Sequence, residues 1–135
     1  MSVNQSQLHS VTNPYSFELN DVKFLGTSGQ FIDDIRRVTN LDDPIDLMKL
    51  TMEAGHLGPT CPDTLACYPF YGNDPFILNE LPHVFFNGNQ AIYKHDKFVD
   101  HYGNKVHLLS LPKFSTSFSC VFFNMKTFES ELISF

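Results

Sequence analysis

The sequence predicts a mixed α/β (α+β) fold, in which short strands accompany two helices within one domain. Residues 31–38 and 44–54 have helical apolar spacing, whereas most other apolar residues form short runs between turn residues. With 135 residues the chain is long enough for one domain at most. Hydrophobic residues make up 42% of it, which allows a packed core, and the 14 Phe side chains lead us to expect apolar surface that meets a partner.

The beginning of the chain predicts a β-hairpin. Residues 1–7 are polar, and we expect them to be disordered. Residues 17–19 and 22–25 read as two short strands around an Asn-Asp pair, since both residue types tolerate the backbone angles of a tight turn. Residues 26–29 follow as a structural turn, because they lack the lysine of a phosphate-binding loop and the glycine spacing of a dinucleotide site.

Two helices are predicted next. The first, over residues 31–38, places Ile32, Ile35 and Val38 on one face. The second, over residues 44–54, begins after an Asp-Asp-Pro sequence that supplies a cap and a suitable first turn, and a Gly follows its last residue. We expect the apolar stripe of this second helix to pack into the core.

Residues 57–79 predict a long irregular loop. They contain four prolines, a density that is incompatible with a regular helix or a central strand. Loops of this length are uncommon inside compact domains and are often functional. Because the loop is also apolar, we expect it to be held against the body of the domain or against a partner. Its large apolar side chains are Leu65, Tyr68, Phe70, Tyr71 and Phe76.

The last third of the chain predicts β-structure. Residues 84–86 read as a short buried strand that ends in a tight turn at the following Gly. Residues 106–111 and 120–123 predict further strands, and residues 131–135 a final edge strand. Residues 94–101 are charged, and we interpret them as an exposed connection.

Composition excludes several kinds of partner. The formal charge is −6 and the Lys and Arg residues do not cluster, so the chain lacks the basic groove that tracks phosphates. No apolar run has the length of a membrane helix. The three cysteines, Cys61, Cys67 and Cys120, include no CxxC pair, and we expect reduced, partly buried thiols in a soluble, intracellular protein.

The histidines do not have metal-ligand spacing. None of them forms HxH, HxxxH or HExxH, and the six are His9, His56, His83, His95, His101 and His107. We expect His95 and His101 to be solvated on the surface. His83, beside a Pro at a strand start, is expected to be a hydrogen-bonded structural histidine.

Several longer segments together resemble one known family. They are residues 12–15, 24–30, 56–65, 67–70, 74–76 and 82–89. This ordered set resembles the B-type small-subunit family of the replicative DNA polymerases alpha, delta and epsilon, and within it the delta branch. The resemblance runs from about residue 8 to residue 135.

The family resemblance implies a particular fold. It implies that residues 1–135 are the C-terminal half of a calcineurin-like metallophosphoesterase β-sandwich flanked by helices. The oligonucleotide-binding-like domain and the first half of the phosphoesterase domain, which family members also carry, are expected to lie outside this chain.

The same resemblance implies a degenerate catalytic site. Active relatives carry His-Gly where this chain has Leu25-Gly26, and Gly-His-x-His where it has Gly88, Asn89, Gln90 and Ala91. Asn replaces an imidazole poorly on a transition metal, and Ala has no ligand atom. We therefore expect no catalytic, cofactor-binding or metal-binding residue and no enzymatic activity.

The function implied by the resemblance is that of a scaffold. The expected partners are the C-terminal metal-binding module of the catalytic subunit and a further accessory subunit, in DNA replication and repair in the nucleus. DNA would be contacted only indirectly, and no membrane is involved. Two alternatives stay open: a metal-dependent phosphodiesterase or exonuclease, and a nucleic-acid-binding module.

Overall fold

The computed structural model describes residues 8–135, so the disorder expected for residues 1–7 lies outside the described residues. Its elements are β1 (Tyr15–Leu19), β2 (Val22–Thr27), α1 (Gln30–Val38), α2 (Pro44–Ala54), β3 (Val84–Gln90), β4 (Lys94–Val99), β5 (Lys105–Pro112), α3 (Phe114–Ser117), β6 (Ser119–Asn124) and β7 (Glu129–Ser134). This mixed composition confirms the predicted α/β class.

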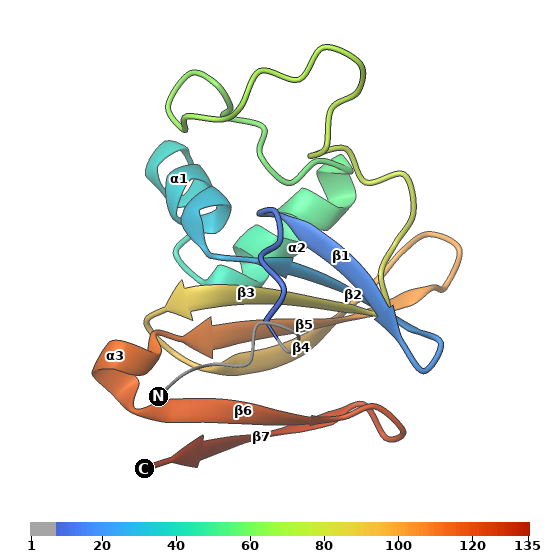
Figure 1. The fold of residues 1–135 in the computed structure, drawn as a ribbon, viewed down its shortest axis with the longest axis vertical. Helices are drawn as coiled ribbons and strands as arrows, with labels where there is room; N and C mark the ends of the chain where they lie inside the picture. Colours follow the sequence, from blue (N-terminus) through green and yellow to red (C-terminus); the bar gives the residue numbers. More distant parts are fainter. Residues whose placement is uncertain (1–7) are drawn as a thin grey trace.

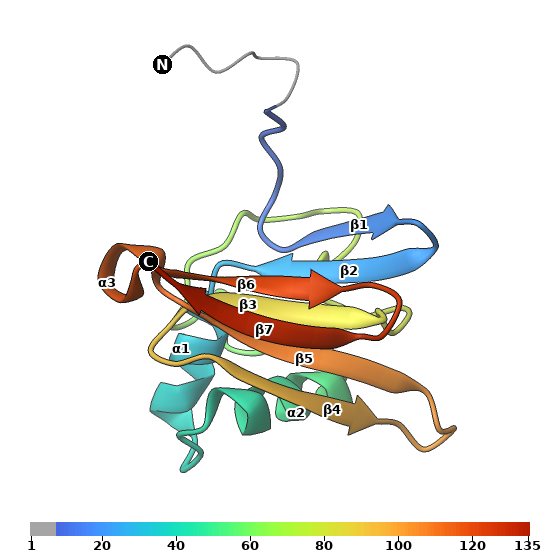
Figure 2. The same cartoon turned by 90° about the horizontal axis from the view of Figure 1, so that it is seen from below.

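The strands form two sheets, and the helices cover one side of the larger sheet. That sheet has the order β1-β2-β3-β5-β4, with β2, β3 and β5 parallel and the two outer strands antiparallel to their neighbours. The hairpin of β6 and β7 forms the second sheet. Helices α1 and α2 lie on one side of the five-stranded sheet and this hairpin on the other (Figures 1 and 2).

Strand β3 is central because it is apolar on both faces. Val84 is 0% exposed and Phe85 is 1% exposed, as expected for a parallel strand that is covered from both sides. Phe85 pairs with Leu25 of β2 and with Leu108 of β5, and all three pack against the helices. The predicted hairpin before it is also present, and its turn residues have positive φ angles, as the Asn-Asp pair allows.

Helix α1 confirms its prediction except for one residue. Ile32 and Ile35 are buried, but Val38 is 59% exposed, so the expectation that it shares their face is wrong. The buried stripe instead includes Asp34, which is 2% exposed. Its carboxylate accepts a hydrogen bond from Thr64 Oγ1 at 2.6 Å, which makes burial of this carboxylate tolerable.

Helix α2 has the predicted bounds. The Asp43 carboxylate accepts a hydrogen bond from the Ile45 amide at 2.9 Å and so caps the first turn. Gly55, with a φ of 65°, ends the helix in the left-handed conformation. The apolar stripe packs into the core as expected, and Leu47 and Met48 are 0% exposed.

Residues 57–79 form the predicted irregular loop. The structure describes all of them and finds neither a helix nor a named strand there. The loop is closed at its base, where the Leu57 amide donates to the Phe76 carbonyl at 2.8 Å. Both of these side chains are buried, whereas Tyr68 and Tyr71 are exposed. The expected contact with the body is therefore made at the base of the loop.

Residues 94–101 do not form the exposed connection that we expected. Residues Lys94–Val99 are β4, an edge strand that pairs with β5. Two of its charged residues form ion pairs with α2 and with the residue that caps this helix. Lys94 pairs with Asp43, and Asp96 Oδ2 lies 2.5 Å from Lys49 Nζ.

The C-terminal strands confirm the remaining predictions with small shifts. β5, β6 and β7 each include most of the residues predicted for them and differ by one to a few residues at their ends. The short helix α3 was not predicted. Its first turn is held by Thr116 and Ser117, whose hydroxyls donate to the Lys113 carbonyl.

Candidate functional site

The carboxyl edge of the parallel strands is the natural position for a site. Chain segments that leave β2 and β3 meet there, and ligands of open α/β sheets commonly bind at this edge. The segment after β2 contains Ser28 and Gly29, and the end of β3 contains Gly88, Asn89 and Gln90. Of these residues, Gly88 and Asn89 belong to the former catalytic site that the sequence predicted.

Strand β3 continues past the turn predicted at Gly88. It extends to Gln90, and its pairing with β5 shifts register between Asn87 and Gln90. Asn89 has a φ of 55° and forms the bulge, because Asn tolerates this conformation better than most residues. Its Nδ2 donates to the Ser28 carbonyl at 2.8 Å, so this side chain links the two strand ends.

Two glycines, one within β2 and one just after it, permit close packing. A Cβ at Gly29, whose φ is 106°, would lie 2.3 Å from the Gly88 carbonyl oxygen. A Cβ at Gly26 would lie 2.2 Å from Cζ of Phe86. Both distances are too short for any other residue without movement of a neighbour. The close approach of the two backbones therefore leaves little space for a ligand.

The other predicted positions do not converge on the edge. Leu25 is 4% exposed and belongs to the core cluster beneath the helices. Gly26 pairs with Phe86, on the opposite face of the sheet from Leu25. Ala91 is exposed just after β3. Of the five predicted positions, the structure brings only Gly88 and Asn89 against the loop after β2.

Neutral polar side chains fill the edge. Asn13 Nδ2 donates to Ser28 Oγ at 2.7 Å and to Gln30 Oε1 at 2.9 Å, and Asn13 Oδ1 accepts from the Ser28 amide at 3.0 Å. Beneath them, Thr27 Oγ1 donates to Asn87 Oδ1 at 2.5 Å. Neither amides nor hydroxyls of this kind act as a general base at neutral pH.

The charged groups near this edge are paired with each other. Arg36 lies 2.8 Å from the Asp33 carboxylate and donates to Gln90 Oε1 at 3.2 Å. Gln90 Nε2 donates in turn to Asp33 Oδ1 at 3.4 Å. Among residues 8–135, no group of three or more His, Cys, Asp or Glu side chains lies close enough to hold a metal ion. The sequence did not reveal this network, because its members are spread over the first 90 residues.

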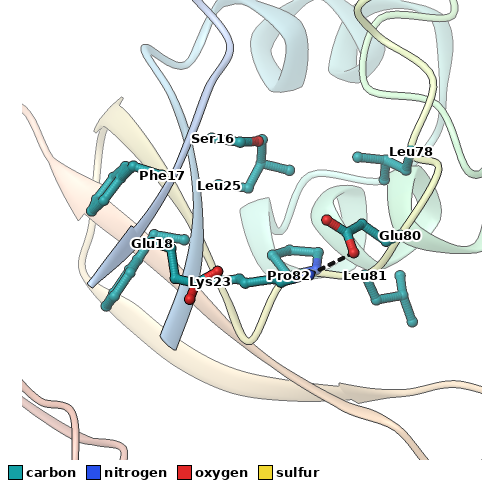
Figure 3. A pocket seen from close by; sticks show the side chains of 10 residues that line it. Ser16, Phe17, Glu18, Lys23, Leu25, Leu78, Glu80, Leu81 and Pro82 are labelled. Atoms are coloured by element: carbon teal, nitrogen blue, oxygen red, sulfur yellow. Dashed lines mark hydrogen bonds and ion pairs between the residues drawn. The ribbon is translucent and has the colours of Figure 1, made fainter. Parts of the chain in front are cut away.

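A groove beside the β1–β2 hairpin contains an ion pair. It has a volume of about 300 Å³ and runs between the hairpin and residues 78–82. Figure 3 shows Lys23 of β2 directed toward Glu80, and their charged atoms lie 2.6 Å apart. The hydrogen bond to Glu80 raises the pKa of Lys23, which keeps the ammonium charged. The lining of this groove, all of it within the described chain, includes no Cys or His.

The histidines have different roles from one another. His83 Nδ1 accepts from the Lys23 amide at 2.9 Å, which confirms a hydrogen-bonded structural role, and His101 is exposed as expected. The prediction for His95 is wrong, since its Nε2 lies 3.1 Å from His107 Nδ1 and its Nδ1 lies 2.6 Å from Ser130 Oγ. The alternation of side chains along 94–99 could have revealed this pair, had that segment been read as a strand.

The thiol of Cys61 is not activated. All three cysteines are free and half-buried, as predicted. Burial, with Cys67 close by, raises the pKa of the Cys61 thiol to about 11. Such a thiol is protonated at neutral pH and is a poor nucleophile.

In the described part of the chain, no helix is long and apolar enough to cross a membrane.

Comparison with known proteins identifies relatives of one kind. Residues 1–98 match the family model for the B-type subunits of DNA polymerases alpha and epsilon. Over 126 residues the chain is 40% identical to the DNA polymerase delta small subunit of Arabidopsis thaliana and 39% identical to DNA polymerase delta subunit 2 of Drosophila melanogaster. Each alignment covers 93% of this chain and 29% of the relative.

A fungal relative is similar over a comparable region. The chain is 32% identical over 153 residues to the DNA polymerase delta small subunit of Saccharomyces cerevisiae, an alignment that covers 96% of this chain and 31% of the relative. The chain thus spans about three tenths of the length of the curated relatives that it matches.

Proposed function

The chain belongs to the family of the B-type subunits of DNA polymerases alpha and epsilon, and we propose that it is part of a non-catalytic accessory subunit of DNA polymerase delta. Relatives with that name from a plant, an insect and a yeast align with more than nine tenths of the chain. In this role the protein acts in DNA replication and repair in the nucleus.

The observation that carries the non-catalytic part of the proposal is the occupied carboxyl edge. Asn89, at a position where active relatives are expected to have an imidazole, donates a hydrogen bond to the Ser28 carbonyl at 2.8 Å. Neighbouring amides and hydroxyls are hydrogen-bonded to one another, and Arg36 is paired with Asp33. A dinuclear hydrolase needs ligands that hold two metal ions around the reacting phosphate, and these side chains do not provide them.

The fold that we propose for this chain is the C-terminal half of a calcineurin-like β-sandwich. Support comes from the side of the sheet opposite the helices, where a groove of about 360 Å³ is lined only by apolar side chains. The two-stranded β6–β7 hairpin covers this side incompletely, and both of its outer edges lack a neighbouring strand within the described residues. Further parts of the full-length subunit would extend this small sheet and close the groove.

As a scaffold, the protein would bind the C-terminal metal-binding module of the catalytic subunit and a further accessory subunit. The net charge of −6 supports contact with proteins rather than direct contact with DNA. The chain and its partners would therefore meet DNA only as a complex.

Co-expression tests this proposal directly. The full-length subunit is expected to co-purify with the C-terminal module of the polymerase delta catalytic subunit, and to release no product from a generic phosphodiester in the presence of Mn²⁺. Failure to co-purify would contradict the scaffold role. Hydrolysis that is lost on treatment with a chelator would favour the alternative of a metal-dependent phosphodiesterase.

A further inference from the structure

The loop of residues 57–79 carries a groove away from the carboxyl edge. In Figure 1 the loop extends beyond α1 and α2, on the side of the helices that faces away from the sheet. The groove has a volume of about 420 Å³, and its lining includes His56, Cys61, Tyr68, Tyr71 and Phe76. Four aromatic side chains, those of Tyr68, Phe70, Tyr71 and Phe76, border this open space.

The base of the loop is anchored in the core. Phe76 is 6% exposed, and its ring packs edge-on against Phe31 of α1 with the centroids 5.2 Å apart. Thr64 is hydrogen-bonded to the buried Asp34, and Leu65 packs against the core cluster. These contacts, together with four prolines, restrict the backbone that presents the groove.

The outer part of the loop is aromatic and uncovered. Tyr68 is 73% exposed, Phe70 is 49% exposed and Tyr71 is 100% exposed. Tyr68 and Phe70 pack edge-to-face with centroids 5.1 Å apart. Large aromatic side chains on a restricted backbone lose little conformational entropy on binding, and they are the residues that most often dominate interfaces.

Within the described residues, the lining of the groove contains the carboxylate of Asp74 and no Lys or Arg. From Leu50 to Tyr93 the sequence contains no Lys or Arg. Asp63 is exposed, and the side chain of Asp74 is 42% exposed at the groove wall. The Phe76 amide and the His56 imidazole hold the pKa of Asp74 below its usual range, so that this carboxylate stays ionised.

We propose that this groove binds an extended, basic segment of another subunit of the polymerase complex, with Lys or Arg side chains against the rings of Tyr68 and Tyr71. Aromatic faces attract cations, and the nearby carboxylates strengthen that preference. The same carboxylates repel phosphates, which disfavours a nucleic acid as the occupant. The identity of the partner rests on the function proposed above, whereas its chemistry follows from the groove.

The first test is photo-cross-linking in the assembled complex. Tyr71 of the full-length subunit is replaced by p-benzoylphenylalanine, the complex is irradiated, and the linked peptide is identified by mass spectrometry. We expect the cross-link to fall in a segment of another subunit that contains Lys or Arg. Cross-links only within the same chain, only to bound DNA or to an acidic segment would each overturn the proposal.

The second test measures assembly. Replacing both tyrosines, Tyr68→Ala and Tyr71→Ala, should weaken binding of the full-length subunit to its partner about tenfold or more, as for other aromatic interface residues. Asp63→Lys should weaken binding by a smaller factor that shrinks at high salt. The matched control is Tyr102→Ala, since Tyr102 is 91% exposed in the β4–β5 turn, outside the groove.

The outcomes separate this inference from the proposed function. If the wild-type subunit co-purifies with the catalytic subunit and the groove variants bind as tightly as Tyr102→Ala, the groove proposal is overturned and the scaffold role stands. If the wild-type subunit does not co-purify at all, both are overturned. If the groove variants assemble more weakly than Tyr102→Ala and their thermal unfolding is unchanged, the groove proposal is supported.

Discussion

The two faces of the five-stranded sheet are covered by other elements to different extents. Toward the helices, Phe85 is 1% exposed and Leu108 is 0% exposed, and both belong to a continuous core with α1 and α2. Toward the hairpin, the buried cluster contains only Val22, Val84 and Leu109 among the described residues, and partly exposed side chains surround it. The face toward the helices is therefore a closed core. The face toward the hairpin is also apolar, but it is only partly covered.

This difference shows where the chain can depend on another segment. Phe24 and Phe123 meet edge-on across the second face with centroids 6.0 Å apart, so the hairpin is in contact with the sheet. The groove beside them is nevertheless open and entirely apolar in its lining. Exposed apolar patches commonly mark interaction sites, so we expect another segment to cover this groove.

The most demanding test compares two neighbouring residues of the same type. Phe85→Ala should lower the free energy of unfolding by about 3–5 kcal/mol, because it leaves a cavity in a closed core. Phe86→Ala, on the hairpin face, should cost less than half as much, since that side chain is only half-buried. Urea unfolding followed by circular dichroism measures both values, since the chain has no Trp to report by fluorescence.

The same pair shows whether the second face is completed elsewhere. In the full-length subunit the cost of Phe86→Ala should approach that of Phe85→Ala, because the proposed sandwich would cover the ring. If Phe85→Ala and Phe86→Ala lower the free energy of unfolding equally in the 135-residue chain, the two faces do not differ in burial as described.

A smaller effect is expected at the glycine beneath Phe86. Gly26→Ala should destabilise the chain by about 1–3 kcal/mol, because the new methyl group overlaps the ring of Phe86. Combining it with Phe86→Ala should remove most of that cost, as a double-mutant cycle would show. Gly72→Ala is the control, since nothing lies within 4 Å of its Cβ position. Additive effects of the two changes would show that ring and glycine are not in contact.

The helix face depends on a cap as well as on packing. Asp43→Ala should cost about 1 kcal/mol, because the Ile45 amide loses its acceptor at the start of α2. Asp43→Ser keeps a capping oxygen and removes the carboxylate that pairs with Lys94. Most of the stability should therefore return in the Ser variant, measured by urea unfolding. A Ser variant as unstable as the Ala variant would assign the effect to the ion pair.

The smallest effect is a pH dependence at the hairpin face. Burial is the main cause that lowers the pKa of both His95 and His107 from the ordinary value of 6.5. At His107 the neighbouring His95, Lys97 and Lys105 lower the pKa further. At His95 the charge of Lys97 also lowers the pKa, whereas Asp96 opposes the shift. Because the fold favours the neutral imidazoles, their stabilisation is complete above about pH 6.5 and is lost as the pH falls through the lower folded values. The two rings and Ser130 lie where β4 and β5 meet the hairpin.

Thermal unfolding across this pH range measures the effect. Stability should decrease from pH 7 toward pH 5, and the decrease should be shallower in a His95→Gln, His107→Gln double variant. His101→Gln, at an exposed position, should leave the slope unchanged. An unaltered slope in the double variant would show that these imidazoles do not titrate with unfolding.

Local signals account for the elements that were predicted well. Asp43, Pro44 and Gly55 determine both ends of α2 through their own backbone and side-chain preferences, so the sequence alone was sufficient there. The turn between β1 and β2 was predictable for the same reason. Strand β4 was not, because its charged residues Lys94 and Asp96 are compatible with a strand only when α2 supplies partners from about 50 residues away.

The candidate site divides in the same way. The absence of His at position 89 can be read from the sequence. The arrangement of the bulge cannot, because Asn89 bonds to the Ser28 carbonyl, which lies in the segment after β2. The position of Leu25 in the helix-side core likewise follows from sheet pairing with Phe85. Residue identities thus show that no imidazole occupies these positions, and tertiary contacts decide how the residues present are arranged.

The uninterrupted absence of Lys and Arg from Leu50 to Tyr93 also has a consequence for proteolysis. Trypsin cleaves after these residues. A complete digest should therefore contain one fragment, Leu50 to Lys94, that includes the end of α2, the loop of residues 57–79 and β3. Enzymes that acetylate or ubiquitinate lysine likewise have no acceptor residue in the described lining of the groove on this loop. A signal that regulated this surface would have to use its Tyr, Thr or Cys side chains instead.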